Sequence, residues 1–129
     1  MNIIADTNIF LTVSLNEPEK ARIISLTMDS SIIAPEILPY EIGNALSAMI
    51  KRKKLSKKEA LEVEIVTNLI PVRLVSVDIH EALRIAAEQN IYAYDAYFLQ
   101  CARAHSLPLL TLDKRMKLVA EMLGVQVLE

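Results

Sequence analysis

The amino-acid sequence predicts an α/β fold in which helices cover both faces of a parallel sheet. Short apolar or β-branched runs alternate with longer stretches of helical periodicity along the 129 residues. The runs are brief and largely apolar, which is typical of parallel strands that are buried on both faces. The length suits one hydrophobic core, so we expect a single domain spanning residues 1–129.

Five runs are predicted to be strands because they are rich in β-branched and apolar residues. They are Asn2–Ala5, Ser31–Ala34, Arg73–Val77, Pro108–Thr111 and Val125–Leu128. Helices are expected between them. The stretch from Phe10 to Pro18 leaves two alternatives open: we expect Pro18 to start a helix, and the residues before it form either a loop or a helical turn.

Several segments carry the signals that begin and end helices. Ser56 and Glu59 have the spacing of a capping box, and Asp78 resembles a second start of this kind. A last helix is expected between Asp113 and Gly124, where the glycine supplies the C-terminal stop. Apolar residues recur at helical spacing in the first and last of these helices: Leu61, Ile65 and Leu69 in one, and Met116, Val119, Ala120 and Leu123 in the other.

Composition limits the classes of function. The formal net charge of −2 excludes a globally basic surface, so any nucleic-acid binding must be local. No uncharged apolar run approaches the roughly 18 residues that a membrane span needs, and the N-terminus has no basic segment of a secretion signal. The single cysteine, Cys101, cannot form an internal disulfide. We therefore expect a soluble cytoplasmic protein without a membrane partner.

Two acids directly follow predicted strands. Asp6 comes after the first strand and Asp113 after the fourth. Ligands of open α/β sheets bind at the carboxyl ends of the strands, so both positions suit a functional carboxylate. Each residue could instead cap the helix behind it. For Asp6 the two interpretations stay open, whereas Asp113 taken alone favours capping.

Two further acids lie inside predicted helices. Asp95 has Phe98, Leu99 and Ala102 as its helical neighbours, which places a carboxylate in an apolar stripe. Such a group needs a cation or several hydrogen-bond donors to offset its desolvation, and this favours a functional role. Glu41 follows Pro39 in the first turn of a helix, where it could equally be a surface acid favoured by the helix dipole.

Four acids at one edge of a sheet would require a counter-cation. Two unit charges about 4 Å apart repel each other by about 4 kcal/mol at an effective dielectric constant near 20. Carboxylate oxygens without thiolate or paired imidazole ligands select Mg²⁺ or Mn²⁺, which bind together with waters and substrate phosphates. The pattern indicates phosphoester chemistry, with in-line attack by a water that the metal activates.

Over nearly its whole length the chain resembles the PIN-domain family, and specifically the toxin ribonucleases of VapBC toxin–antitoxin pairs. Four segments carry the resemblance in order: Asp6-Thr7-Asn8, Glu41-Ile42-Gly43-Asn44, Tyr94-Asp95-Ala96 and Leu110-Thr111-Leu112-Asp113. One such motif is a weak signal, whereas all four in order on alternating strands and helices are a strong one. No matched position departs from the acidic pattern.

The resemblance implies a three-layer α/β/α fold with a five-stranded parallel sheet in the order 3-2-1-4-5, which would bring Asp6 and Asp113 together. It also implies a metal-dependent endoribonuclease that cleaves single-stranded or structured RNA, works with Mg²⁺ or Mn²⁺, forms a homodimer and pairs with a cognate antitoxin. Metal binding and catalysis would fall to Asp6, Glu41, Asp95 and Asp113, with Thr7, Asn8, Asn44 and Thr111 in support.

Two alternatives compete with a nuclease. A haloacid-dehalogenase-like phosphatase also places an Asp after its first strand, but it needs a second Asp two residues later, where this chain has Asn8. A catalytically idle PIN-like module that binds a protein partner is the stronger competitor. The high hydrophobic fraction suits such an interface, although it equally suits a well-filled core.

Other polar and aromatic residues have simpler interpretations. The basic run 51–54 could contact RNA phosphates, but a solvated helix end explains it fully. Four tyrosines could stack on bases of single-stranded RNA, Tyr40, Tyr92, Tyr94 and Tyr97, and of these we consider only Tyr92 and Tyr94 plausible. Core packing or an interface is favoured over base stacking. We interpret the remaining candidates as structural: His80, His105, Cys101 and Asp78.

Overall fold

The computed structural model describes all residues, 1–129, as four strands and seven helices. In chain order they are β1 (Asn2–Ala5), α1 (Thr7–Ser14), α2 (Lys20–Thr27), β2 (Ser31–Pro35), α3 (Leu38–Lys51), α4 (Lys57–Asn68), β3 (Arg73–Val75), α5 (Ile79–Gln89), α6 (Ala93–His105), β4 (Leu109–Leu110) and α7 (Lys114–Met122). No helix is long and apolar enough to cross a membrane.

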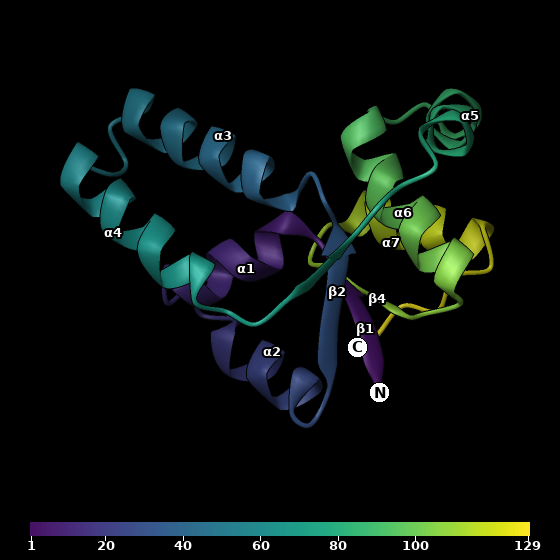
Figure 1. Cartoon of the computed structure of the whole chain (residues 1–129), viewed down its shortest axis with the longest axis horizontal. Helices are drawn as coiled ribbons and strands as arrows, with labels where there is room; N and C mark the ends of the chain where they lie inside the picture. The colour runs from purple at the N-terminus through teal and green to yellow at the C-terminus, as the bar shows by residue number, and fades with distance from the viewer.

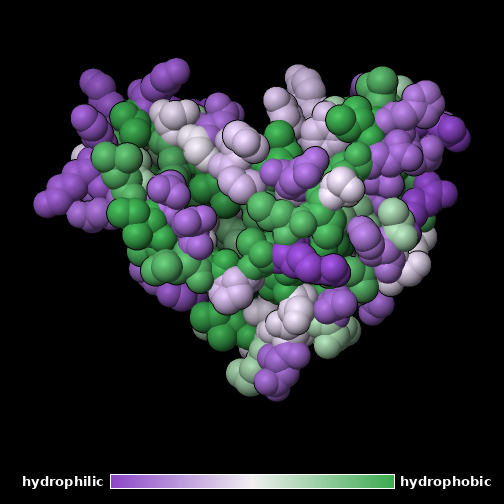
Figure 2. All heavy atoms as spheres, in the orientation of Figure 1, coloured by the Kyte–Doolittle hydropathy of each residue, from purple (hydrophilic) through white to green (hydrophobic).

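The strands form one parallel sheet in the order β3-β2-β1-β4. Helices α1 to α4 lie on one side of it and α5 to α7 on the other, so the predicted three-layer α/β/α architecture is confirmed (Figure 1). Parallel pairing brings the carboxyl ends of all four strands to one edge. Above this edge α3 and α6 diverge, and a notch separates them in the outline of the molecule (Figure 2).

The predicted fifth strand, Val125–Leu128, does not form as a strand, but this segment lies beside β4 as the predicted order requires. Val127 forms a single parallel bridge with Leu109, on the side of β4 away from β1. The ladder stops there because β4 has only two residues, Leu109 and Leu110. Beyond them the hydroxyl of Thr111 accepts a hydrogen bond from the backbone N–H of Asp113 at 3.1 Å, which begins a turn instead of extending the strand.

Two segments differ from the sequence prediction near their ends. Residues 10–14 belong to the helix α1, residues 15–17 lie outside it, and α2 begins at Lys20, two residues after the proline. Strand β3 ends at Val75 instead of Val77 because the chain turns toward Asp78, whose backbone N–H donates to the side chain of Gln100 at 3.2 Å. The predicted caps at Ser56 and Asp78 are both present.

The core fixes the strands that carry the polar edge. Ile3, Ile4 and Ala5 of β1 are fully buried, as is Leu109 of β4. They belong to a cluster of 23 buried residues that also includes Phe98 and Leu99 of α6. Each fully buried aliphatic or aromatic side chain stabilises the fold by roughly 1.5–3 kcal/mol relative to an exposed one. The residues that follow β1 and β4 are therefore held in fixed positions relative to α6.

The apolar face predicted for α4 is not part of the core. Leu61, Ile65 and Leu69 share one face of the helix, but they are 57%, 61% and 75% exposed. The face that packs inward carries Ala60 and Thr67 instead. Periodicity identified the apolar stripe correctly and could not say what covers it.

Candidate active site

One pocket at the carboxyl edge of the sheet contains all four acids that the sequence singled out. It has a volume of about 270 Å³, and both α3 and α6 contribute residues to its lining. Thirteen residues line it: Asp6, Thr7, Asn8, Ile37, Tyr40, Glu41, Asn44, Ala45, Tyr94, Asp95, Phe98, Asp113 and Met116. Four segments that are far apart in the sequence therefore place their carboxylates around one concavity.

Each acid lies at the N-terminal end of a helix. Asp6 caps α1 by accepting from the backbone N–H of Ile9 at 3.3 Å, and Asp113 caps α7 by accepting from Met116 at 3.0 Å. Glu41 and Asp95 occupy the first turns of α3 and α6. The positive ends of four helix dipoles thus face a region of negative side chains and partly offset their charge. Capping and a place in the pocket, which the sequence presented as alternatives, hold together for Asp6 and Asp113.

Two threonine hydroxyls orient the carboxylates. Thr111 donates to Oδ2 of Asp6, and Thr7 donates to Oε2 of Glu41. The Thr111 hydroxyl also accepts from the backbone N–H of Asp113, so it links the acids that follow β1 and β4. Of the four residues expected in support, Thr7, Asn8 and Asn44 line the pocket, while Thr111 lies buried beneath Asp6.

Burial and mutual proximity raise the pKa values of three acids. Desolvation raises the pKa of Asp6 to about 6, against hydrogen bonds from Thr111 and Ile9 that lower it, while the charges of Asp113 and Asp95 raise it. Burial also raises the pKa of Glu41, and the charge of Asp95 raises it further. Burial likewise raises the pKa of Asp95, to which the charge of Asp113 adds. The four carboxylates therefore interact electrostatically as one group.

The donor set suits a hard divalent cation. Only carboxylates, amides and hydroxyls contribute polar side chains around the acids, and neither histidine lines the pocket. In this structure no three acidic side chains are arranged closely enough to hold one metal ion together. This arrangement fits Mg²⁺ or Mn²⁺, which take one or two carboxylates and keep several waters, and it does not fit an ion that needs a closed protein cage.

Replacing Thr111 with valine tests the hydroxyl link. Valine keeps the shape but removes the donor to Asp6 and the acceptor for Asp113, and unsatisfied buried groups of this kind cost about 1–3 kcal/mol. We expect a loss of that size in the free energy of unfolding, measured with urea at pH 7.5, together with a further rise in the pKa of Asp6. Thr111→Ser, which keeps the hydroxyl, is expected to lose less. Equal losses in both variants would attribute the effect to packing.

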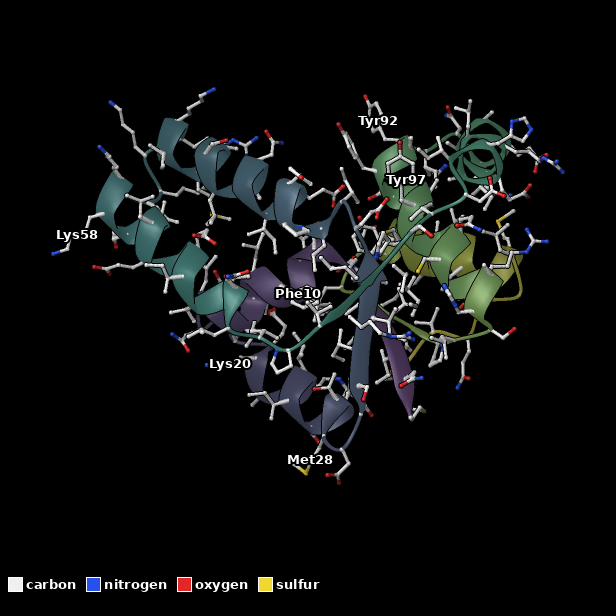
Figure 3. All side chains as sticks on the ribbon, viewed as in Figure 1. Phe10, Lys20, Met28, Lys58, Tyr92 and Tyr97 are labelled. Carbon is white, nitrogen blue, oxygen red and sulfur yellow. The ribbon has the colours of Figure 1, made fainter.

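The tyrosines near the pocket differ from the sequence interpretation. Tyr40 and Tyr94 line the pocket with 76% and 58% of their surface exposed, so neither packs into the core. Tyr92 does not line it, although Figure 3 shows this side chain at the end of α6 that borders the notch. Sequence reasoning missed Tyr40 despite its place directly before Glu41, because only the tilt of α3 decides which side of its first turn faces the acids.

The basic run lies away from the acids. Lys51 ends α3 and residues 52–54 form the turn before α4. Ten residues of helix separate Lys51 from Glu41, which is about 15 Å along the axis. Figure 3 shows Lys58, at the start of α4, pointing away from the notch. The position matches the solvated helix end that the sequence favoured.

Fold and site together define a three-layer α/β/α domain with an acidic pocket at the carboxyl edge of its sheet. The chain belongs to the PIN domain family, since the sequence profile of that family matches residues 3–122. No curated protein matches the sequence.

Solved structures share the fold. PAE2754 from Pyrobaculum aerophilum superposes with a TM-score of 0.68 at 17% identity, over 96% of this chain and 90% of that one. VapBC2 from Rickettsia felis, bound to a DNA fragment from its promoter, superposes with a TM-score of 0.65 at 17% identity, over 100% of this chain and 98% of that one. FitAcB from Neisseria gonorrhoeae superposes with a TM-score of 0.63 at 20% identity, over 98% of this chain and 96% of that one.

Proposed function

We propose that this protein is a metal-dependent endoribonuclease that cleaves single-stranded RNA. The observation that carries the proposal is the pocket at the carboxyl edge of the sheet, which is lined by Asp6, Glu41, Asp95 and Asp113. A group of interacting carboxylates with one buried member, Asp6, is destabilising by itself, so its presence in a PIN domain supports a binding role for a cation.

In this proposal the four acids hold Mg²⁺ or Mn²⁺. When bound, the ion lowers the pKa of a coordinated water and stabilises charge on the phosphate and the leaving oxygen. Thr111 and Thr7 donate hydrogen bonds to Asp6 and Glu41 and so restrain the orientation of these two carboxylates. Asn8 and Asn44 line the same pocket and can donate amide hydrogen bonds to phosphate oxygens.

The raised pKa values set the protonation state of the site. Metal ligands must be deprotonated, so protons compete with the cation for the same carboxylates. Because the pKa of Asp6 is about 6, its side chain is largely ionised at pH 7 and largely protonated at pH 5. Cation binding should therefore weaken as the pH falls through 6.

We also propose that the protein is the toxin of a toxin–antitoxin pair, acts in the cytoplasm and forms a homodimer. Its fold matches VapBC2 and FitAcB, and its four acid segments resemble those of VapBC toxins. A protein partner is supported by α4, which exposes Leu61, Ile65, Val66 and Leu69 to solvent. Apolar faces of this kind mark interaction sites on soluble proteins.

The test is an RNA-cleavage assay with metal and with chelator. Single-stranded RNA is expected to be cut in the presence of Mg²⁺ or Mn²⁺, to survive in EDTA, and to be cut again when metal is added in excess. Isothermal titration calorimetry of the metal alone should show binding that weakens from pH 7.5 to pH 5. Cleavage that persists in EDTA would refute the metal role.

A catalytically idle interaction module is the second candidate, and the exposed face of α4 is the observation that favours it. It would be supported if the protein bound metal but left single-stranded RNA intact under all of these conditions.

A further inference from the structure

A second pocket adjoins the acidic one. It has a volume of about 420 Å³ and is lined by Glu36, Ile37, Tyr40, Val77, Ile79 and Tyr97. The two pockets share Ile37 and Tyr40, so one continuous surface runs from the acids into this mostly apolar hollow. Its volume falls in the range of about 300–1,000 Å³ that is typical of small-ligand sites.

The walls of the second pocket are aromatic where it meets the acids. Tyr40 is largely exposed at the junction, and Tyr97 reaches the hollow from α6, at the end of that helix that borders the notch (Figure 3). Tyr94 meets Tyr97 edge to face with ring centroids 6.0 Å apart. Such a contact limits how the Tyr97 ring can turn, which leaves a defined aromatic surface beside the acids.

Charge decides which part of a nucleotide can enter. Glu36 is the only charged residue of the lining, and its negative charge repels a phosphate. The uncharged base is the part that an apolar, aromatic wall attracts, since aromatic side chains stack on unpaired bases. A phosphate near the acids carries a nucleoside on each side, and the adjoining hollow is within reach of one of them.

We propose that this second pocket binds one unpaired nucleobase of the strand whose phosphate lies in the acidic pocket, with Tyr40 as the residue that separates base from phosphate. The inference rests on the proposed nuclease function and adds to it the place where one base of the RNA is held. Stacking accepts every base, so recognition here is tolerant of sequence. Bases inside a duplex are already stacked and paired, so the pocket selects single strands.

Binding measurements test the base site independently of cleavage. In the Asp95→Asn background, a fluorescein-labelled single-stranded RNA is titrated with protein and followed by anisotropy. Stacking is worth about 1–3 kcal/mol per base, so Tyr40→Ala should raise Kd about 5- to 150-fold. Tyr40→Phe, which keeps the ring, should stay near the parent value. Tyr92→Ala is the matched control, because Tyr92 is 84% exposed and lines neither pocket.

An abasic nucleotide identifies the ligand as a base. One abasic position is moved along the RNA, and at one position it should weaken binding to the parent about as much as Tyr40→Ala does. The same RNA should then bind the Tyr40→Ala variant with no further loss, since both changes remove one contact. Additive losses, or an unchanged Kd for Tyr40→Ala, would overturn the inference.

Two further measurements distinguish the base site from the nuclease proposal and from a dimer interface. If the wild-type protein cuts RNA and the Tyr40→Ala variant has the same KM for RNA, the nuclease proposal stands and the base site is refuted. If Tyr40→Ala instead converts a dimer to a monomer in sedimentation, the hollow is an interface between copies of the chain and the base site is refuted. The expected result is an unchanged sedimentation coefficient with a raised KM.

Discussion

Replacing Asp95 with asparagine is expected to abolish metal-dependent RNA cleavage and to leave the protein folded. Asp95 lies half-buried in the first turn of α6, and its charge acts on both Asp6 and Glu41. Asparagine has the same shape but one weaker oxygen ligand and no charge. Losing a residue that only orients a metal ligand costs about 10–100-fold in affinity or activity, so losing a proposed ligand should cost more.

The comparison needs both kinetics and structure. Initial rates of cleavage are measured at saturating Mg²⁺, and circular dichroism reports the fold. Glu81→Gln is the matched control, since Glu81 is also an acid in the first turn of a helix, α5, but lies outside the acidic pocket. The control should cut RNA at the wild-type rate. An Asp95→Asn variant that cuts equally well would remove this carboxylate from the site.

The fold could be predicted because its signals are local. The buried runs of β1 and β2 and the caps at Ser56 and Asp78 are properties of a few neighbouring residues, and each lies where the sequence indicated. The lengths of the strands were harder to predict from the sequence. The side-chain turn at Thr111 ends β4 early and reduces the fifth strand to a bridge, and this turn competes with a β-branched sequence that is otherwise typical of a strand.

The place of the acids could also be predicted in part. Residues after parallel strands share one edge, so Asp6 and Asp113 follow from topology, and Asp95 follows from its apolar neighbours Phe98 and Leu99, which are buried. The roles of the acids remain a prediction. The position of Tyr40 could not be read from the sequence, because it depends on how α3 packs against α1 and α4. For the same reason, the sequence could not show that α4 leaves its apolar stripe uncovered.

Replacing Asp6 with asparagine is expected to stabilise the metal-free protein at neutral pH. Burial raises the pKa of Asp6 from 3.8 to about 6, so the folded state holds this proton more tightly than the unfolded state. The favourable contribution of the protonated form is present at low pH and is lost as the pH rises from about 4 through 6. Above that range the ionised carboxylate costs on the order of 3 kcal/mol, from about 2 pKa units at 1.36 kcal/mol each. Asparagine carries no charge and remains a good helix cap, so it avoids the cost.

Urea unfolding in EDTA at pH 4.5 and pH 7.5 measures the effect. The free energy of unfolding of Asp6→Asn should exceed that of the wild type at pH 7.5, and the gap should shrink at pH 4.5. Asp78→Asn is the control, because Asp78 caps α5 through the same kind of bond, to Glu81 at 3.1 Å, but lies outside the pocket. Mg²⁺ should narrow or reverse the gap at pH 7.5, since a ligand that binds only the folded wild type stabilises it. A lower stability of Asp6→Asn at both pH values would mean that the carboxylate mainly stabilises α1 as a cap. Its negative charge would then not destabilise the metal-free protein.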